Sequence, residues 1–246
     1  MQPRALLGLA LAVCVLVVGV LAALVLLAPR PGATPVETPE ARWAAPAAVP
    51  ERAASPTSAG VAGLVDADWL ATMAVRTGIP QRALAAYAGV AIAKAEQMPS
   101  CGLGWNTLAA VGYAESGHGS FGGASIGEDG AVSPAIIGIA LDGGSTEVIT
   151  DTDDGVIDGD AEHDRAVGPM QLIPQTWRNW HVDASGDGAE DPHNIDDAVM
   201  AAANYLCRSS GDMTSETGWR AGIAAYNSAP AYITKVAAAG TGYAAR

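Results

Sequence analysis

From residue 63 onward, the spacing of apolar residues predicts a series of helices. Residues 67–75 form a short amphipathic segment that ends near Gly78, and Gln81–Gln97 carries a longer stripe with helical spacing. Because this stripe is rich in alanine, we expect close helix packing rather than deep burial. Its members are Leu84, Tyr87, Ala88, Ala91 and Ala95.

Asn106 is a favourable residue for capping the start of a helix, and it predicts a third helix over residues 107–116. Gly117 and Gly119 would end this helix. Further helices are predicted over residues 174–180, 195–208, 215–226 and 231–239.

The segment between residues 120 and 165 has a different pattern, because it is rich in glycine and acidic, with isolated Val and Ile residues. It predicts loops with short strands around residues 135–140 and 147–150. Helices and strands do not alternate along the chain, so we expect a mainly α domain with a small irregular lobe.

The N-terminal segment predicts a membrane anchor. Residues 5–28 carry no charge, and as a helix they would extend about 36 Å, enough to span a hydrocarbon core of about 30 Å. A cleavable signal peptide has a shorter apolar core and a small-residue cleavage site, whereas Pro29-Arg30-Pro31 follows here directly. We therefore expect a transmembrane helix within residues 1–28, with the amino terminus in the cytoplasm.

Residues 29–62 carry seven prolines among Ala, Thr, Ser and Glu and show no apolar periodicity. This composition predicts an extended tether between the anchor and a folded domain over residues 63–246. The domain would then lie on the outer side of a bacterial cell membrane.

The charge balance narrows the class of protein. The chain has a formal net charge of −13, and nucleic-acid binding depends on cationic side chains, so we exclude nucleic-acid binding.

Cys101 and Cys207 are the two cysteines outside the anchor, and export would favour a disulfide between them. Two buried thiols are the alternative.

Glu115 lies at the C-terminal end of an otherwise apolar predicted helix. The helix dipole and the apolar neighbours both disfavour its ionised form, so the pKa is expected to rise, as a general acid requires. Taken alone, a glutamate at a helix end equally fits a solvated surface residue.

Four segments in order strengthen the catalytic interpretation. Glu-Ser-Gly-His-Gly at 115–119 is followed by Asp-Arg-Ala-Val-Gly-Pro-Met-Gln at 164–171, by Asp-Pro-His-Asn at 191–194, and by Ala-Tyr-Asn-Ser at 225–228. Over about residues 64–240 the chain resembles the lytic murein transglycosylases, particularly the membrane-bound B-type, SLT-like branch and its actinobacterial relatives.

The resemblance implies a lysozyme-like helical fold that cleaves the β-1,4 bond between N-acetylmuramic acid and N-acetylglucosamine in peptidoglycan glycan strands. Glu115 matches the catalytic glutamate, which protonates the glycosidic oxygen. The muramyl 6-hydroxyl then attacks C1, and a 1,6-anhydro end forms without water and without an organic cofactor. A second carboxylate, which ordinary glycosidases need, is not required.

The resemblance also implies a set of substrate-binding residues. Gln171 would border the catalytic cleft, and Tyr226 and Asn227 would face the glutamate. Met170 could line a sugar subsite or belong to the core, and Ser116 could contact substrate or organise the helix end.

The loop after residue 182 has part of the pattern of a calcium site. Asp183, Ser185, Asp187 and Asp191 offer oxygen ligands with suitable spacing, and some B-type transglycosylases bind calcium in such a loop. Asn194 replaces the usual twelfth ligand and suits the N-cap of the next helix, so a polar turn is the alternative. The Asp151–Gly155 run is less ordered, and we assign no metal to it.

Three other functions stay open from the sequence. A hydrolytic muramidase of the same fold would use water, and the eleven carboxylates between Glu128 and Asp164 could hold its second acidic group. A non-catalytic wall-binding protein could keep the fold, although the residues matched to the motifs disfavour it. The acidic stretch alone would also suit a calcium-stabilised adhesion module. Protein partners are not indicated.

Overall fold

The computed structural model describes residues 42–144 and 146–246, and this part of the chain is mainly helical. No helix within it is long and apolar enough to cross a membrane. The anchor predicted over residues 1–28 lies outside the described residues. The α-helices are α2 (Ala67–Thr77), α3 (Gln81–Gln97), α4 (Trp105–Ser116), α5 (Pro174–Trp180), α6 (Ile195–Ser210), α7 (Glu216–Tyr226) and α8 (Pro230–Ala244).

Helix α3 is deeply buried, contrary to our expectation of close packing without deep burial. All residues from Ala83 to Lys94 are buried, because α2, α4, α6 and the short 3-10 helix η1 (Val61–Leu64) all pack against it. Small alanine side chains allow these neighbours to approach from several sides at once. The apolar stripe in the sequence marks only one face of the helix, whereas its neighbours contact several faces.

Helix α4 begins one residue before Asn106, so the predicted capping role of this residue is wrong. Gly104 occupies the N-cap position, and the Asn106 side chain is completely buried. Its amide donates to the carbonyls of Ala45 and Gly240 at 2.9 and 3.1 Å and accepts from the Ala47 N–H at 2.9 Å. Asn106 therefore joins three segments that are distant in the sequence.

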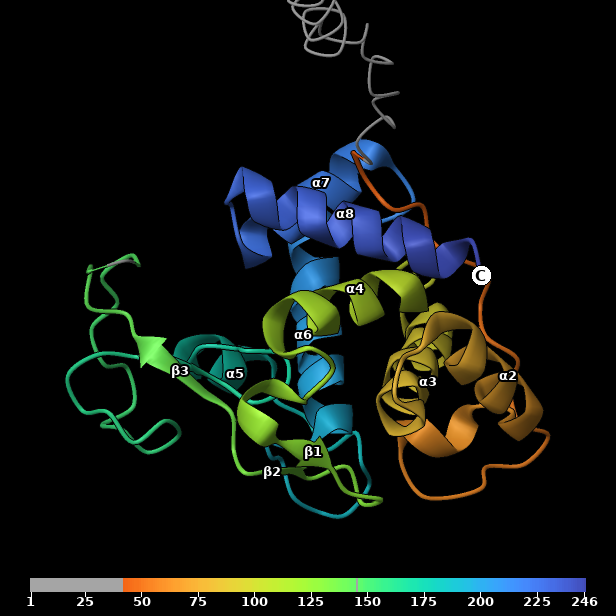
Figure 1. Cartoon of the computed structure of the whole chain (residues 1–246), viewed down its shortest axis with the longest axis horizontal. Helices are drawn as coiled ribbons and strands as arrows, with labels where there is room; N and C mark the ends of the chain where they lie inside the picture. Colours follow the sequence, from red (N-terminus) through yellow and green to blue (C-terminus); the bar gives the residue numbers. More distant parts are fainter. Residues whose placement is uncertain (1–41, 145) are drawn as a thin grey trace, which may run out of the picture. The chain divides into compact units, whose positions relative to one another are not determined.

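Helix α8 lies along α4, with α7 beside it (Figure 1). Gly240 lets the segment that carries Ala44 pack closely onto α8, because a Cβ atom there would lie 2.7 Å from Ala44 Cβ. On the other side of the core, α6 packs against both α3 and α7. The completely buried Trp219 of α7 donates from its indole to Thr107 Oγ1 of α4 at 3.0 Å.

The irregular lobe contains four short strands. β1 (Ser125–Ile126) pairs antiparallel with β2 (Val132–Ser133), and β3 (Ile137–Ala140) pairs antiparallel with β4 (Arg165–Val167). The short 3-10 helix η2 (Phe121–Gly123) precedes them. β3 confirms the first predicted strand, whereas the second is reduced to isolated bridges at Val148 and Thr150. In Figure 1 the loops after β3 extend away from α2 and α3.

The described part of the predicted tether packs onto the helical domain. Ala44 is completely buried against the core, and Arg52 forms a β-bridge with Val65. The Glu51 carbonyl accepts from the Asp66 N–H at 2.9 Å. Residues 42–62 therefore belong to the same compact unit as the helices, and our domain start at residue 63 was too late. Proline here stops helix formation without preventing burial.

Cys101 and Cys207 form the predicted disulfide, with their Cα atoms 5.4 Å apart. Cys101 lies just before α4 and Cys207 lies in the last turns of α6. The bond therefore joins two helices of the core across 106 residues of sequence.

Replacing both cysteines by serine should destabilise the domain. Loss of a cross-link over such a long loop corresponds to about 4–5 kcal/mol in the chain-entropy model. Urea unfolding of the oxidised protein and the double variant measures the difference. Wild-type protein in reductant is the control and should unfold like the variant. An unchanged midpoint after reduction would contradict the structural role of the bond.

Candidate active site

Glu115 lies in the last turn of α4, which ends at Gly117 in the left-handed conformation with φ 59°. The side chain is half-buried, and this burial raises its pKa to about 7. A hydrogen bond from Tyr232 and the charge of Lys235 act in the opposite direction and lower the pKa. The loss of solvation is the larger effect, so a substantial fraction of Glu115 is protonated at neutral pH.

Tyr232 of α8 is the direct partner of this carboxyl group. Its hydroxyl donates to Glu115 Oε1 at 2.5 Å, and its own pKa is strongly raised by burial. Sequence reasoning did not identify Tyr232. The one hint in the sequence was the position of Tyr232 five residues after Asn227. Its hydrogen bond to Glu115 depends on how α8 packs against α4.

A cavity of about 750 Å³, the Glu115 cavity, opens beside this carboxyl group. Three of the predicted substrate-binding residues, Gln171, Tyr226 and Asn227, line it together with Glu115. They come from three separate segments: the end of α4, the loop after β4, and the end of α7. The fold thus brings together the residues that the motifs singled out.

Tyr226 is anchored by a hydrogen bond that its hydroxyl donates to the carbonyl of Met170 at 2.6 Å. Met170 itself is completely buried, so its side chain belongs to the core and does not line a sugar subsite. Ser116 is also buried; it donates to the Pro169 carbonyl at 2.6 Å and accepts from the Gly119 N–H at 2.7 Å. Its role is to fix the end of α4 against the loop that carries Met170.

Gln171 has a left-handed backbone conformation with φ 47°. Its backbone N–H donates to the Gly168 carbonyl at 3.2 Å and closes a tight turn between β4 and α5, and its side-chain amide donates to the same carbonyl at 3.0 Å. Gly168 is required at this turn, because its φ is 72° and a Cβ atom would lie 1.9 Å from the Pro192 carbonyl oxygen. The strained turn holds the Gln171 side chain at the cavity wall.

The irregular lobe supplies a second carboxylate to the Glu115 cavity. Glu147 lies in the loop after β3 and lines the cavity with Leu141 and Ile149. Its side chain is exposed, unlike that of Glu115. The sequence showed eleven carboxylates in this stretch without indicating which of them would face the site.

The predicted calcium ligands lie in the loop before α6. Asp183 accepts backbone N–H groups of Gly186 and Gly188 at 2.6 and 2.9 Å and the hydroxyl of Ser185 at 3.2 Å. Asp187 and Asp191 each accept from a backbone N–H two residues further along.

Asn194 caps α6, as expected, by accepting from the Asp196 N–H at 2.9 Å. Asp197, in the first turn of α6, does not complete this cap, because the Asn194 N–H donates to the Asp191 carbonyl at 3.0 Å. The buried Asp197 carboxylate instead accepts from the N–H groups of Ala184, Ser185 and Asp191, which closes the loop. The side chains of the predicted ligands therefore bond to groups of their own loop, and their oxygens do not converge on one cation position. Calcium here stays a prediction, and no catalytic step depends on it.

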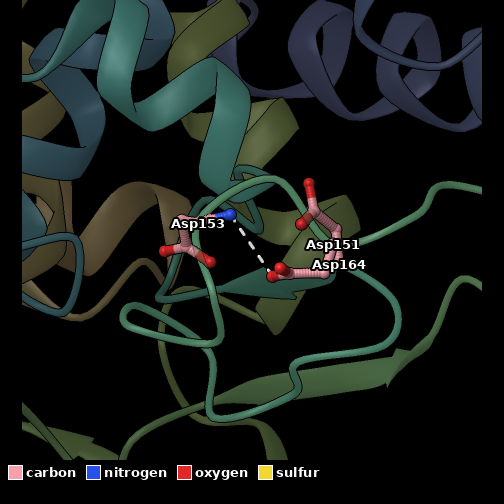
Figure 2. Close-up of side chains that lie close together, drawn as sticks. All are labelled: Asp151, Asp153 and Asp164. Carbon is pink, nitrogen blue, oxygen red and sulfur yellow. Dashed lines mark hydrogen bonds between the residues drawn. The ribbon is translucent and has the colours of Figure 1, made fainter.

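A different set of carboxylates converges in the irregular lobe. Asp151, Asp153 and Asp164 each place a ligand oxygen within 4.8 Å of the others, the one such group of His, Cys, Asp or Glu within residues 42–144 and 146–246 (Figure 2). The Asp153 N–H donates to Asp151 Oδ1 at 3.3 Å, and the buried Asp164 accepts from the Thr152 N–H at 2.9 Å. Oxygen ligands of this kind could hold a hard divalent cation. We assigned no metal to residues 151–155 because that run is less ordered in sequence, and Asp164, which completes the group, lies outside it.

Comparison with known proteins agrees with this geometry. Residues 164–238 match the family model of the Transglycosylase SLT domain, which is characteristic of peptidoglycan lytic transglycosylases, lyases that act on glycans. The match supports an enzyme of this general class and a mainly helical, lysozyme-like domain with peptidoglycan as substrate. It covers less than a third of the chain and includes Gln171, Tyr226 and Asn227 but not Glu115. No curated protein and no solved structure gives a significant match.

Replacing Tyr232 by phenylalanine should raise the pKa of Glu115. The lost hydrogen bond favoured the ionised carboxylate, so its removal favours the protonated form. NMR titration of the Glu115 side-chain carboxyl measures the shift directly. Tyr226→Phe is the matched control, because that hydroxyl donates to a backbone carbonyl and not to Glu115. An unchanged or lowered pKa in Tyr232→Phe would contradict the hydrogen bond as an influence on Glu115.

Proposed function

We propose that this protein is a lytic transglycosylase that cleaves the β-1,4 bond between N-acetylmuramic acid and N-acetylglucosamine and leaves a 1,6-anhydro muramyl end. The observation that carries the proposal is Glu115, a half-buried carboxyl group with a raised pKa that borders a 750 Å³ cavity. The match of residues 164–238 to the Transglycosylase SLT domain supports peptidoglycan as the substrate class. A glycan strand needs an open cavity of this kind, lined by both polar and apolar groups.

In the first step, protonated Glu115 donates its proton to the bridging oxygen while the bond from C1 to that oxygen breaks. The developing positive charge at C1 is then met by the 6-hydroxyl of the same sugar, whose oxygen bonds to C1. The hydroxyl proton passes to the Glu115 carboxylate, which restores the acid. A pKa near neutrality suits both halves of this cycle, because the group must give and accept a proton in turn.

The surrounding residues position the groups that react. Tyr232 donates to one Glu115 oxygen and leaves the other free to face the substrate. Asn227 and Gln171 present amides at the cavity wall, where they could bond to sugar hydroxyl or acetamido groups. Tyr226, fixed by its bond to the Met170 carbonyl, shapes the wall near Glu115.

A hydrolytic muramidase is the second candidate, and Glu147 is the observation that favours it. An exposed carboxylate lining the same cavity as a protonated carboxyl group is the pair that an ordinary glycosidase uses. The transglycosylase route needs no such partner. The two candidates therefore differ in what happens when Glu147 loses its charge.

We also propose that the enzyme acts outside the cytoplasmic membrane, held there by the apolar segment within residues 1–28. Its substrate class lies in the cell wall, and disulfides such as Cys101–Cys207 persist in oxidising compartments. The uncharged run over residues 5–28 supports a single-pass anchor.

Glu115→Gln should lower the rate of peptidoglycan cleavage by about a hundredfold to ten-thousandfold, since an amide cannot donate the proton. Mass spectrometry of glycans released from purified sacculi measures both the rate and the product. We expect anhydro ends, which are about 18 Da lighter than hydrolysed ends because no water is added. Glu216→Gln is the matched control, because this exposed glutamate of α7 does not line the cavity.

Glu147→Gln separates the two candidates in the same assay. The transglycosylase keeps producing anhydro ends in this variant, whereas a muramidase would lose activity and its wild type would release hydrolysed ends. Full activity of Glu115→Gln would remove the catalytic assignment in either case.

Activity should fall as the pH rises above about 7. Glu115 must enter the reaction protonated, and its pKa is about 7, so each further pH unit should lower kcat/KM about tenfold. Initial rates on soluble glycan strands between pH 5 and 9 test this. A rate that stays level up to pH 9 would mean that Glu115 is not the acid.

A further inference from the structure

A second cavity, of about 500 Å³, lies along α8 from Lys235 toward the C-terminal end of the helix. We name it the α8 trough. Residues 235, 239 and 242 are spaced so that they share one face of the helix, and Arg246 follows just after its last residue, Ala244. Tyr113 of α4 and Thr77 of α2 lie opposite them. The full lining is Thr77, Tyr113, Lys235, Ala238, Ala239, Gly242, Tyr243 and Arg246.

The α8 trough is basic, although the chain as a whole carries a formal charge of −13. Lys235 and Arg246 line it, and none of its lining residues is acidic. Of the other eight arginines in residues 42–144 and 146–246, three are held in ion pairs: Arg52 with Glu96, Arg82 with Asp196, and Arg165 with Asp160. No such pair involves Lys235 or Arg246 in this part of the chain. Their charges are therefore available to an anionic ligand.

Lys235 is held in place at the start of the trough. Its Nζ donates to the carbonyl of Ala114 at 3.1 Å and lies 5.2 Å from the centre of the Tyr113 ring. The ring is nearly half exposed and offers a flat face beside the charge. An ammonium group with one backbone contact keeps further N–H donors for a ligand carboxylate.

The trough begins next to the catalytic carboxyl group. Lys235 contacts the residue before Glu115, and it follows Tyr232 by three positions on the same face of α8. The charge of Lys235 also acts on Glu115. A strand whose sugars lie in the Glu115 cavity therefore has a basic surface beside the bond that is cleaved.

The length of the trough suits a short peptide. Lys235 lies nine helical positions before Ala244, the last residue of α8, a rise of about 14 Å, and Arg246 follows two residues later. An extended peptide of about four residues covers the length of this helical part. Ala238, Ala239 and Gly242 lie between the two cations and leave room for a backbone.

We propose that the α8 trough binds the carboxylate-bearing peptide arm of a peptidoglycan strand whose sugar chain occupies the Glu115 cavity. This inference rests on the proposed function and names a further part of its substrate. Lys235 and Arg246 would be specificity-determining residues that favour strands carrying peptides over bare strands.

Three soluble substrates test the proposal: glycan strands with peptides, the same strands after amidase treatment, and amidase-treated strands whose lactyl carboxylates are capped as methylamides. We expect Lys235→Gln and Arg246→Gln to raise KM for peptide-bearing strands about threefold to tenfold relative to both other substrates. Lys235→Arg should restore the wild-type ratio. Arg208→Gln is the matched control, because this exposed arginine of α6 lines neither cavity.

Comparing substrates within one variant removes the effect of Lys235 on Glu115, because that effect is shared by all three. An equal rise of KM on all three substrates would overturn the proposal. An equal rise on the first two alone would overturn the peptide arm and assign the carboxylate to the lactyl group of the sugar. Failure of the wild type to cleave any of the three would contradict the proposed function itself, an outcome distinct from both.

Discussion

The packing of α8 along α4 is the interaction on which the site depends. It brings the Tyr232 hydroxyl to the Glu115 carboxyl and covers that group enough to raise its pKa. Gly240 lets Ala44 pack closely against α8, and the buried Asn106 amide fixes the two helices to residues 45–47. A buried amide with all its polar atoms bonded is costly to disrupt, since a separated partner would leave unpaired groups in the core. The geometry of the acid thus depends on contacts well away from it.

The protonation of Glu115 results from opposing effects of different size. Burial disfavours the negative charge, whereas the Tyr232 hydroxyl and the Lys235 ammonium favour it. Burial prevails, and it raises the pKa of Glu115 to about 7. A proton donor that is also the later acceptor needs this intermediate value, because too strong an acid would not be protonated and too weak an acid would not donate.

The acidic loops of the irregular lobe form the opposite side of the cavity. Their carboxylates accept mainly backbone N–H groups nearby, as Asp151 and Asp160 do. These bonds replace regular sheet in a segment that is too rich in glycine for long strands. The same loops bring Leu141, Glu147 and Ile149 to the Glu115 cavity. The acidic composition therefore serves local loop structure, while the basic side chains that could meet an anionic substrate gather along α8.

The sequence by itself determined most helices, the disulfide and the candidate residues Glu115, Gln171, Tyr226 and Asn227. These features follow from apolar periodicity, from the number of cysteines and from short motifs, all of which can be seen without knowing which distant segments touch. The tertiary structure decided what depends on contacts between distant segments. It placed α3 within the core, and it buried Met170 and Ser116 away from substrate. Asn106, which we expected to cap a helix, instead bonds to two distant segments of the chain. It also added Tyr232, Glu147 and the α8 trough. A hydrogen bond across 117 residues, such as that between Tyr232 and Glu115, leaves no local pattern, since only the packing of two helices brings its partners together.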